Sequence, residues 1–298
     1  MAPLTHSYFC GASTTQIIYK TIGRYFDEMV QDHPDNPALL VRHQGISWTY
    51  RELQTRVDQL ATGLLALNVR PGDRVGIWGP NSSEWVLVQL ATAKVGAVMV
   101  CINPAYRLYE LEYALNKVSC SVLICDVQFK TSDYLGMITT LAPELALSGQ
   151  EHLQAEKLPH LQHVVRMGSE HTPGMHNFDD VCHMGGAVEV ELLQALQKQL
   201  KPDDAINIQF TSGTTGNPKG ATLSHCNILN NGFLTGLAMQ LTPKDKLCVP
   251  VPLYHCFGMV MSVLACVSHG ATMVFPGPSF DPEETLRTVE EESCTALH

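Results

Sequence analysis

Ten consecutive residues combine the groups that phosphate binding requires. They contain three glycines, four hydroxyl side chains and one lysine, and in order they are Thr211, Ser212, Gly213, Thr214, Thr215, Gly216, Asn217, Pro218, Lys219 and Gly220. Glycine permits a positive φ, so successive backbone N–H groups can point into one concavity and bind anionic oxygens. The ammonium of Lys219 adds a compact positive charge that can stabilise a departing phosphate group. The sequence therefore predicts a loop that holds phosphates.

Three other interpretations compete with phosphate binding. A Walker A loop has Ser or Thr directly after its lysine, whereas Gly220 follows Lys219 here, so a P-loop NTPase is disfavoured. A loop rich in Gly, Ser and Thr can be a simple turn, but a lysine at the end of so many hydroxyls and glycines favours a ligand. Ser224 and His225 are the residue types of a hydrolase, but neighbours in sequence do not face each other and no GxSxG motif occurs. Ser224 is instead expected to cap a helix.

Histidines provide the next candidates. His255 lies in an apolar stretch of the sequence. A histidine among apolar neighbours is more often a buried residue with satisfied hydrogen bonds than a catalytic one. Four further side chains are of types that can ligate a metal, namely His171, His176, Cys182 and His183. Their spacing matches no zinc pattern, so a polar loop is the favoured interpretation and no metal site is predicted.

The composition describes a globular chain and excludes several classes of protein. Of the 298 residues, 45% are hydrophobic and 16% are charged, and the formal net charge is −10. A field of this sign repels phosphate backbones, so no nucleic-acid partner is expected. Residues 247–280 contain no charged side chain, but prolines and glycines interrupt them, which predicts a buried segment rather than a membrane span. Ten cysteines without a CxxC pair fit a reducing compartment.

Helical and strand patterns alternate from Trp48 onward. A capping box of Thr49 and Glu52 predicts the start of one helix, Asn81 or Ser82 is expected to cap a second, and Asp281 a last one. The periodicity predicts further helices over 108–118 and 188–200, and strands over 73–79, 97–102, 120–126, 163–167, 205–210 and from 294 onward. Strands that alternate with helices indicate an α/β fold of mostly parallel sheets flanked by helices.

Several segments around the phosphate loop resemble the AMP-forming acyl-CoA synthetases of the adenylate-forming superfamily. The loop sequence TSGTTGNPKG is the signature of that family, and the similarity is closest to its mitochondrial medium-chain members. It extends to WGPNS (78–82), NPAY (103–106), LEYAL (111–115), NIQF (207–210), GATLSH (220–225) and PLYHC (252–256). Nearly the whole chain is covered, and the fold expected is the N-terminal part of the large domain of such an enzyme.

The resemblance implies a two-step reaction in one site. A fatty carboxylate attacks ATP to give acyl-adenylate and pyrophosphate, and the thiol of CoA then displaces AMP, with Mg²⁺ as the companion ion. Residues Thr211–Lys219 would hold the β and γ phosphates, His255 would lie beside the acyl carboxylate, and Phe257–Val267 would line an acyl tunnel. Lys219 and His255 are thus the catalytic candidates, and the expected partners are small-molecule substrates. A mitochondrial location is implied, with the cytoplasm as the alternative because the N-terminal targeting signal is weak.

The resemblance also sets expectations about domain organisation. The YGxTE and TGD segments, the hinge and the small C-terminal domain of such enzymes do not occur in this sequence. The chain is therefore expected to be a truncated form with little or no autonomous activity, or alternatively a non-catalytic nucleotide-binding or interaction module. It is expected to comprise an N-terminal segment (1–47), a first α/β subdomain (48–200) and an incomplete subdomain with the phosphate loop and acyl pocket (201–298).

Overall fold

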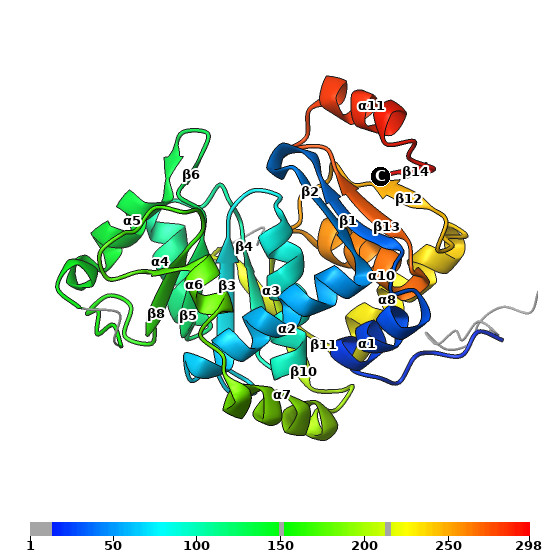
Figure 1. The fold of residues 1–298 in the computed structure, drawn as a ribbon. Coiled ribbons are helices and arrows are strands. Elements are labelled where there is room, and N and C mark those ends of the chain that lie inside the picture. The colour runs from blue at the N-terminus through cyan, green and yellow to red at the C-terminus, as the bar shows by residue number, and fades with distance from the viewer. Residues whose placement is uncertain (1–13, 149–151, 212–215) are drawn as a thin grey trace, which may run out of the picture.

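The computed structural model describes residues 14–148, 152–211 and 216–298. Within them the chain forms two large β-sheets with helices between and around them (Figure 1). The seven-stranded sheet has the order β11-β10-β4-β3-β5-β8-β9. In that order its strands are Lys219–Ser224, Ala205–Thr211, Val98–Ile102, Arg74–Trp78, Val122–Cys125, His163–Arg166 and His176–Asn177. All neighbouring pairs are parallel except β10 and β11.

The five-stranded sheet joins residues from both ends of the chain. Its order is β14-β12-β13-β1-β2, with strands Ala296–Leu297, Lys246–Cys248, Thr272–Phe275, Pro37–Val41 and Ile46–Thr49. Only β1 and β2 are antiparallel, and Leu39 of β1 is paired with Met273 of β13. β6 (Gln128–Phe129) and β7 (Ser132–Asp133) form a separate hairpin. The expectation of mostly parallel sheets flanked by helices is confirmed.

Helices α1 (Ile22–Asp32), α2 (Tyr50–Ala66) and α3 (Ser83–Val95) pack against one another, with α3 on β3 and β4 of the seven-stranded sheet and α2 on β1 and β2 of the five-stranded sheet. α3 is buried on nearly every side because it packs against α2 and against β3 and β4. Alternation along the strands gives the seven-stranded sheet two apolar faces. Val75 and Ile77 of β3 face these three helices, whereas Trp78 faces α4 (Leu108–Lys117) and α5 (Tyr134–Leu141).

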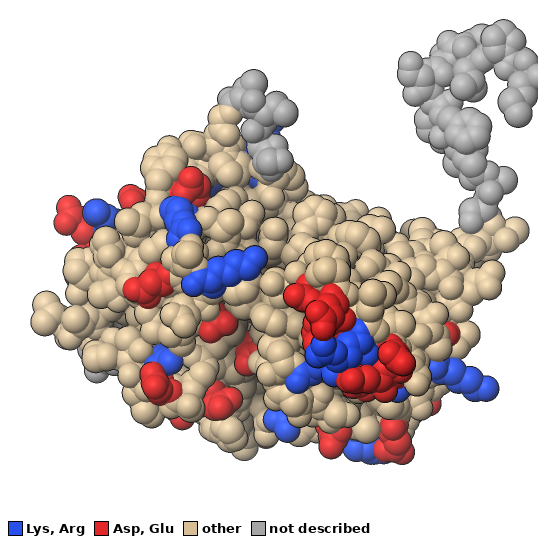
Figure 2. All heavy atoms as spheres, turned by 90° about the horizontal axis from the view of Figure 1, so that it is seen from above, with Lys and Arg blue, Asp and Glu red and all other residues tan. Residues whose placement is uncertain are grey.

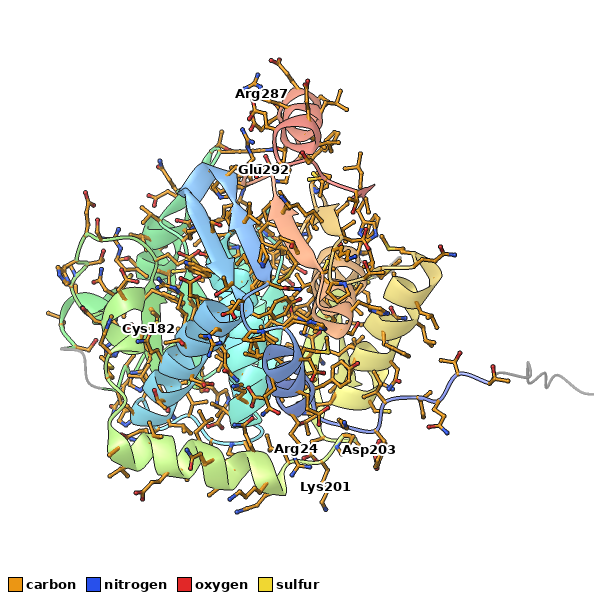
Figure 3. The ribbon with its side chains drawn as sticks, turned by 45° about the vertical axis from the view of Figure 1, so that its right-hand side comes forward. Arg24, Cys182, Lys201, Asp203, Arg287 and Glu292 are labelled. Atoms are coloured by element: carbon orange, nitrogen blue, oxygen red, sulfur yellow. The ribbon has the colours of Figure 1, made fainter. Side chains whose placement is uncertain are left out.

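Six further helices complete the described part of the structure, and most of them share the core of α1, α2 and α3. They are α6 (Phe178–Cys182), α7 (Ala187–Gln199), α8 (His225–Ala238), α9 (Cys256–Gly258), α10 (Ala265–His269) and α11 (Pro282–Glu291), with a π-helical turn at Met259–Leu264 and 3₁₀ turns at Arg42–Gln44 and Pro143–Ala146. α7 and α11 lie at opposite ends of the molecule, as Figure 3 shows with Lys201 beyond α7 and Arg287 on α11. No helix in the described part of the chain is long and apolar enough to cross a membrane.

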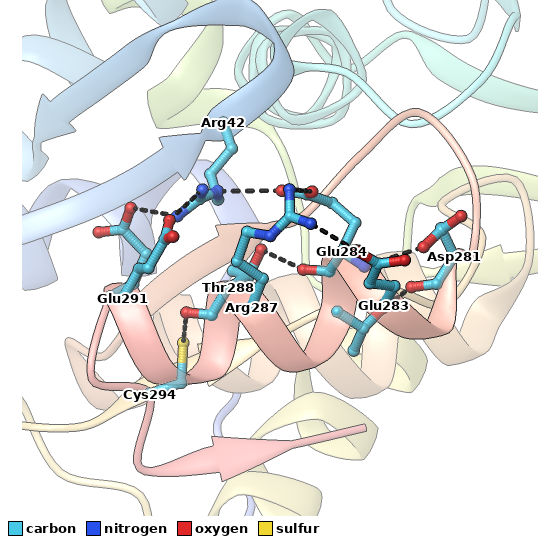
Figure 4. A network of polar contacts seen from close by, with 10 residues as sticks. Arg42, Asp281, Glu283, Glu284, Arg287, Thr288, Glu291 and Cys294 are labelled. Atoms are coloured by element: carbon cyan, nitrogen blue, oxygen red, sulfur yellow. Dashed lines mark hydrogen bonds and ion pairs between the residues drawn. The ribbon is translucent and has the colours of Figure 1, made fainter.

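α11 is attached to the first part of the chain by a network of charges (Figure 4). The guanidinium of Arg42 pairs with Glu284 at 3.3 Å, with Glu292 at 3.1 Å and with Glu291. Seen from above, charged side chains gather around this helix while most of that face is uncharged (Figure 2). One arginine near β1 thus fixes a helix that lies more than 240 positions later in the sequence.

The expected start signals are present at α2 and α11. Thr49 and Glu52 form the capping box of α2, and the carboxylate of Asp281 accepts the N–H of Glu284 at the start of α11. Ser82 rather than Asn81 stands at the N-cap position of α3, but its hydroxyl makes no capping hydrogen bond, and Oε1 of Gln44 accepts the N–H of Ser83 at 2.8 Å instead. β1 pairs with β13, and β10 pairs with β4, so both sheets take strands from more than one of the three expected segments. The division into those segments stays a prediction.

Candidate active site

The phosphate loop connects β10 to β11. Thr211, the last residue of β10, is paired with Lys219, the first of β11, and its hydroxyl donates a 3.5 Å hydrogen bond to the Lys219 carbonyl oxygen. Ser212, Gly213, Thr214 and Thr215 lie outside the described residues. Gly216 has a φ of +151°, a backbone conformation that other residues rarely adopt. The loop therefore leaves the sheet at the carboxyl end of β10, the edge where ligands of open α/β sheets bind.

Helix α4 supports the second half of this loop. The hydroxyl of Tyr109 donates to Oδ1 of Asn217 at 3.4 Å, and that of Tyr113 donates to the carbonyl oxygen of Pro218 at 3.3 Å. Residues four apart lie on one face of a helix, so α4 directs both hydroxyls toward the loop. Neither tyrosine is among the site residues predicted from the sequence, although their spacing on a predicted helix could have placed them together.

Lys219 lies in the seven-stranded sheet, whereas His255 lies in the segment that follows the five-stranded sheet's strand β12. The side chain of Lys219 is exposed at the start of β11, while His255 follows β12 and is the N-cap residue of α9. Nδ1 of His255 accepts the N–H of Phe257 at 3.1 Å. In the neutral imidazole the proton is then on Nε2, which can donate to an anion. The imidazole is exposed, unlike the buried histidine that its apolar neighbours favoured.

Asn81 connects the loops of the two sheets. Its Nδ2 donates to the Val251 carbonyl oxygen at 2.9 Å, its Oδ1 accepts the N–H of Leu253 at 2.8 Å, and its own N–H donates to the Pro278 carbonyl oxygen at 3.0 Å. The side chain is only 4% exposed, so these bonds are shielded from water. Asn81 thereby fixes the segment that carries His255 against the end of β3. From the sequence, Asn81 was predicted only as a possible N-cap residue of a helix.

A cavity of about 390 Å³ opens where the strand ends of both sheets meet. Its lining includes Asn103 after β4, Tyr254 beside His255, and two exposed cations, Arg107 and Lys130. Arg107 is held by a 3.3 Å hydrogen bond to the hydroxyl of Thr131. Because the whole chain carries a net charge of −10, these two side chains provide a local positive field that suits an anionic ligand.

Two buried aromatic side chains hold the backbone of Asn103 and Pro104, which line this cavity. Trp78 donates from Nε1 to the carbonyl oxygen of Asn103 at 3.1 Å, and the hydroxyl of Tyr134 donates to that of Pro104 at 2.9 Å. The two aromatic rings contact each other with centroids 3.9 Å apart. Both donors are buried, so the backbone at Asn103 and Pro104 is held in one position.

Comparison with known proteins identifies the class. The family model described as AMP-binding enzyme matches residues 26–298, so this chain belongs to that family. The medium-chain acyl-CoA ligase ACSF2, mitochondrial, of Danio rerio is 42% identical over 297 residues, which cover 99% of this chain and 49% of that protein. The putative acyl-CoA synthetase YngI of Bacillus subtilis is 40% identical, with 95% of this chain and 51% of that protein covered. The chain thus spans about half the length of these curated relatives, and the resemblance inferred from its motifs is confirmed.

Solved structures agree on the fold. The anthranilate CoA ligase AuaEII in complex with anthranoyl-AMP superimposes with a TM-score of 0.78 at 24% identity, covering 94% of this chain and 49% of that one. The inhibitor-bound N-terminal domain of FACL13 from Mycobacterium tuberculosis gives a TM-score of 0.75 at 22% identity, covering 93% and 62%. The architecture described above is therefore shared with these two structures.

Proposed function

We propose that this chain carries the phosphate-binding and carboxylate-binding part of an ATP-dependent acyl-CoA ligase. The reaction joins a fatty acid to AMP with release of pyrophosphate, and then transfers the acyl group to CoA. The observation that supports it best is the loop between β10 and β11, which two tyrosines of α4 hold at the carboxyl end of the sheet. Membership of the AMP-binding family and relatives named medium-chain acyl-CoA ligases favour this substrate class.

The residues of the loop would bind the β and γ phosphates of ATP. Backbone N–H groups and hydroxyls of Thr211–Lys219 suit phosphate oxygens, and the Lys219 ammonium opposes the charge that develops on the leaving pyrophosphate. Mg²⁺ would arrive with the ATP phosphates and neutralise part of their charge. The available Nε2–H of His255 would donate to the fatty carboxylate and orient it toward the α-phosphorus. The apolar run Phe257–Val267, largely buried behind His255, would contact the acyl chain.

The cavity at the meeting of the two sheets is the proposed place for the charged part of CoA. Arg107 and Lys130 line it, and both side chains are exposed to an incoming ligand. CoA carries several phosphate groups, and cations placed at a concave site attract such a molecule in a chain of negative net charge. By its similarity to ACSF2, we further propose a mitochondrial location, with the cytoplasm as the alternative given by the bacterial relative.

The test measures AMP formed from ATP, octanoate and CoA by the purified chain. Lys219→Ala should lower the rate about 10²–10³-fold, as expected for loss of one charged group that stabilises the transition state. Lys157→Ala is the matched control, because Lys157 is an exposed lysine in the loop before β8, a strand toward the opposite edge of the sheet from β11. Its rate should equal that of the unsubstituted chain.

A thermal melt with ATP distinguishes the alternatives. If no AMP forms but ATP raises the melting temperature, and Lys219→Ala abolishes the increase, the chain is a nucleotide-binding module without ligase activity. If ATP stabilises neither form and no AMP appears, the assignment of the loop to phosphate binding is wrong. The Lys157→Ala control must respond to ATP as the unsubstituted chain does.

A further inference from the structure

A buried amide connects the strand before the phosphate loop to the segment that carries His255. Gln209 lies in β10, two residues before that strand ends at Thr211. Its side chain is buried, and its Nε2 contacts Sδ of Met259 at 2.7 Å. Met259 is in turn bound to His255, because its N–H donates to the His255 carbonyl oxygen at 3.1 Å. One contact between side chains therefore joins the strand that leads into the loop to the turn that begins at His255.

Met259 is held at both its main chain and its side chain. Nε2 of Gln89, a buried residue of α3, donates to the Met259 carbonyl oxygen at 2.9 Å. Sγ of Cys101, in β4, contacts the Met259 sulfur at 3.7 Å. Met259 is 1% exposed and begins the π-helical turn, a rare geometry that is frequent at functional sites. Its position is therefore set by three elements, α3, β4 and β10.

The amide of Gln209 does more than fill space. Besides Met259, its Nε2 contacts Sγ of Cys101 at 3.1 Å and Oδ1 of Asn207, its neighbour on the same face of β10, at 3.1 Å. Sulfur is a weak acceptor, so these contacts offset only part of the free energy that burial of an amide costs. An apolar side chain of similar size would avoid that cost. What the amide adds is direction, because a buried polar network holds its members in one arrangement.

We propose that Gln209 is a positioning residue of the ligase reaction, which acts through Met259 to set the place of His255 relative to the phosphate loop. The inference rests on the proposed function, in which His255 binds the fatty carboxylate and the loop binds the phosphates of ATP. Attack on the α-phosphorus requires the two substrates to be aligned, and a misplacement of about 1 Å can lower a rate about 100-fold. A contact that fixes the two binding elements to each other meets this requirement. In this role Gln209 contacts neither substrate.

Histidine NMR of the ligand-free protein tests the connection directly. Gln209→Met removes the amide donor and keeps a side chain of similar length, and it should shift the ring resonances of His255 but not those of the exposed His171. Met259→Leu removes the sulfur, conserves volume and should shift the same His255 resonances. Met273→Leu is the matched control, since Met273 is a buried methionine of β13 in the other sheet and should leave His255 in place.

Calorimetric titration with octanoate measures the consequence for binding. Gln209→Met should raise the Kd for octanoate about tenfold, because a displaced His255 loses a hydrogen bond to a charged group. The Kd for ATP should stay unchanged, since the loop keeps its contacts with α4. The double variant Gln209→Met/Met259→Leu should bind octanoate no more weakly than Gln209→Met, because both substitutions break the same connection. Additive losses would overturn the proposal, since the two residues would then act separately.

A purely structural role predicts a different set of results. Gln209→Met would then lower the melting temperature without shifting His255 or changing the Kd for octanoate, and that outcome overturns the proposal. If Gln209→Met does not fold, unshifted His255 resonances in Met259→Leu have the same meaning. If His255 shifts as expected but the unsubstituted chain binds neither octanoate nor ATP, the proposed function fails while the connection between the two segments stands.

Discussion

Acid should unfold this protein partly through His225, a histidine that is buried without charge. His225 is 0% exposed. Its Nδ1 accepts the N–H of Ile22 at 3.1 Å, and this hydrogen bond fixes the start of α1 on α8. The proton of the neutral ring is therefore on Nε2, which has no hydrogen-bond partner among the described residues. Burial lowers the pKa of His225 to about 4, although the carboxylate of Asp204 opposes part of that effect.

The sign and size of the effect follow from the two pKa values. In the unfolded chain histidine titrates near 6.5, so between about pH 6.5 and 4 the unfolded state binds a proton that the folded state does not. The stabilisation is complete above about pH 6.5 and is lost as the pH falls toward 4. The values differ by about 2.5, which at about 1.36 kcal/mol per unit corresponds to about 3 kcal/mol.

Urea unfolding between pH 7.5 and 4.5 measures this contribution. His225→Asn keeps an oxygen that can accept the Ile22 N–H but cannot titrate, so its free energy of unfolding should fall less steeply with acid. Part of the slope should remain, because burial also lowers the pKa of His163 to about 4. His171→Asn, at an exposed position, should reproduce the unsubstituted curve. Parallel curves for His225→Asn and the unsubstituted chain would refute the argument.

Three further substitutions test other contacts. Asn81→Ala should lower the free energy of unfolding in urea by about 2 kcal/mol, because it leaves a buried carbonyl and N–H unpaired; no change would disprove the connection between sheets. Lys94→Met should lower the free energy of unfolding by about 3 kcal/mol in the same assay, because the buried Lys94 ammonium bridges Asp27 at 2.6 Å and Asp58 at 2.5 Å. The control Lys117→Met, at an exposed lysine, should lower it by under about 0.5 kcal/mol. Tyr113→Phe should raise the Kd for ATP measured calorimetrically without lowering the melting temperature, and an unchanged Kd would count against support of the loop by α4.

Local signals in the sequence were sufficient to predict where most helices and strands begin. The capping box at Thr49 and the N-cap at Ser224 are present because each depends on atoms only three residues away. The phosphate loop was found for the same reason, although four of its residues lie outside the described part of the chain. Its position between β10 and β11 required only the strand that precedes it.

Contacts between distant residues could not be predicted. Asn81 and Ser82 are equally good caps by type, and the choice between them is made by Val251 and Leu253, about 170 positions later. The hydrogen bond between the imidazoles of His163 and His176 depends on the register of two parallel strands. The exposure of His255 is set by the turn that begins α9, not by its apolar neighbours in the sequence.

The pairing of β1 with β13 has a consequence during synthesis. Leu39 and Met273 become neighbours only after the ribosome has added the 233 residues between these positions and the second strand has emerged. At about 5–20 residues per second this takes roughly 10–50 s. During that interval the apolar strand Pro37–Val41 is paired with β2 on one side only. Its other edge has unpaired N–H and C=O groups, which could pair with strands of other chains. Among the described strands, the first to be made thus waits longest for its second neighbour.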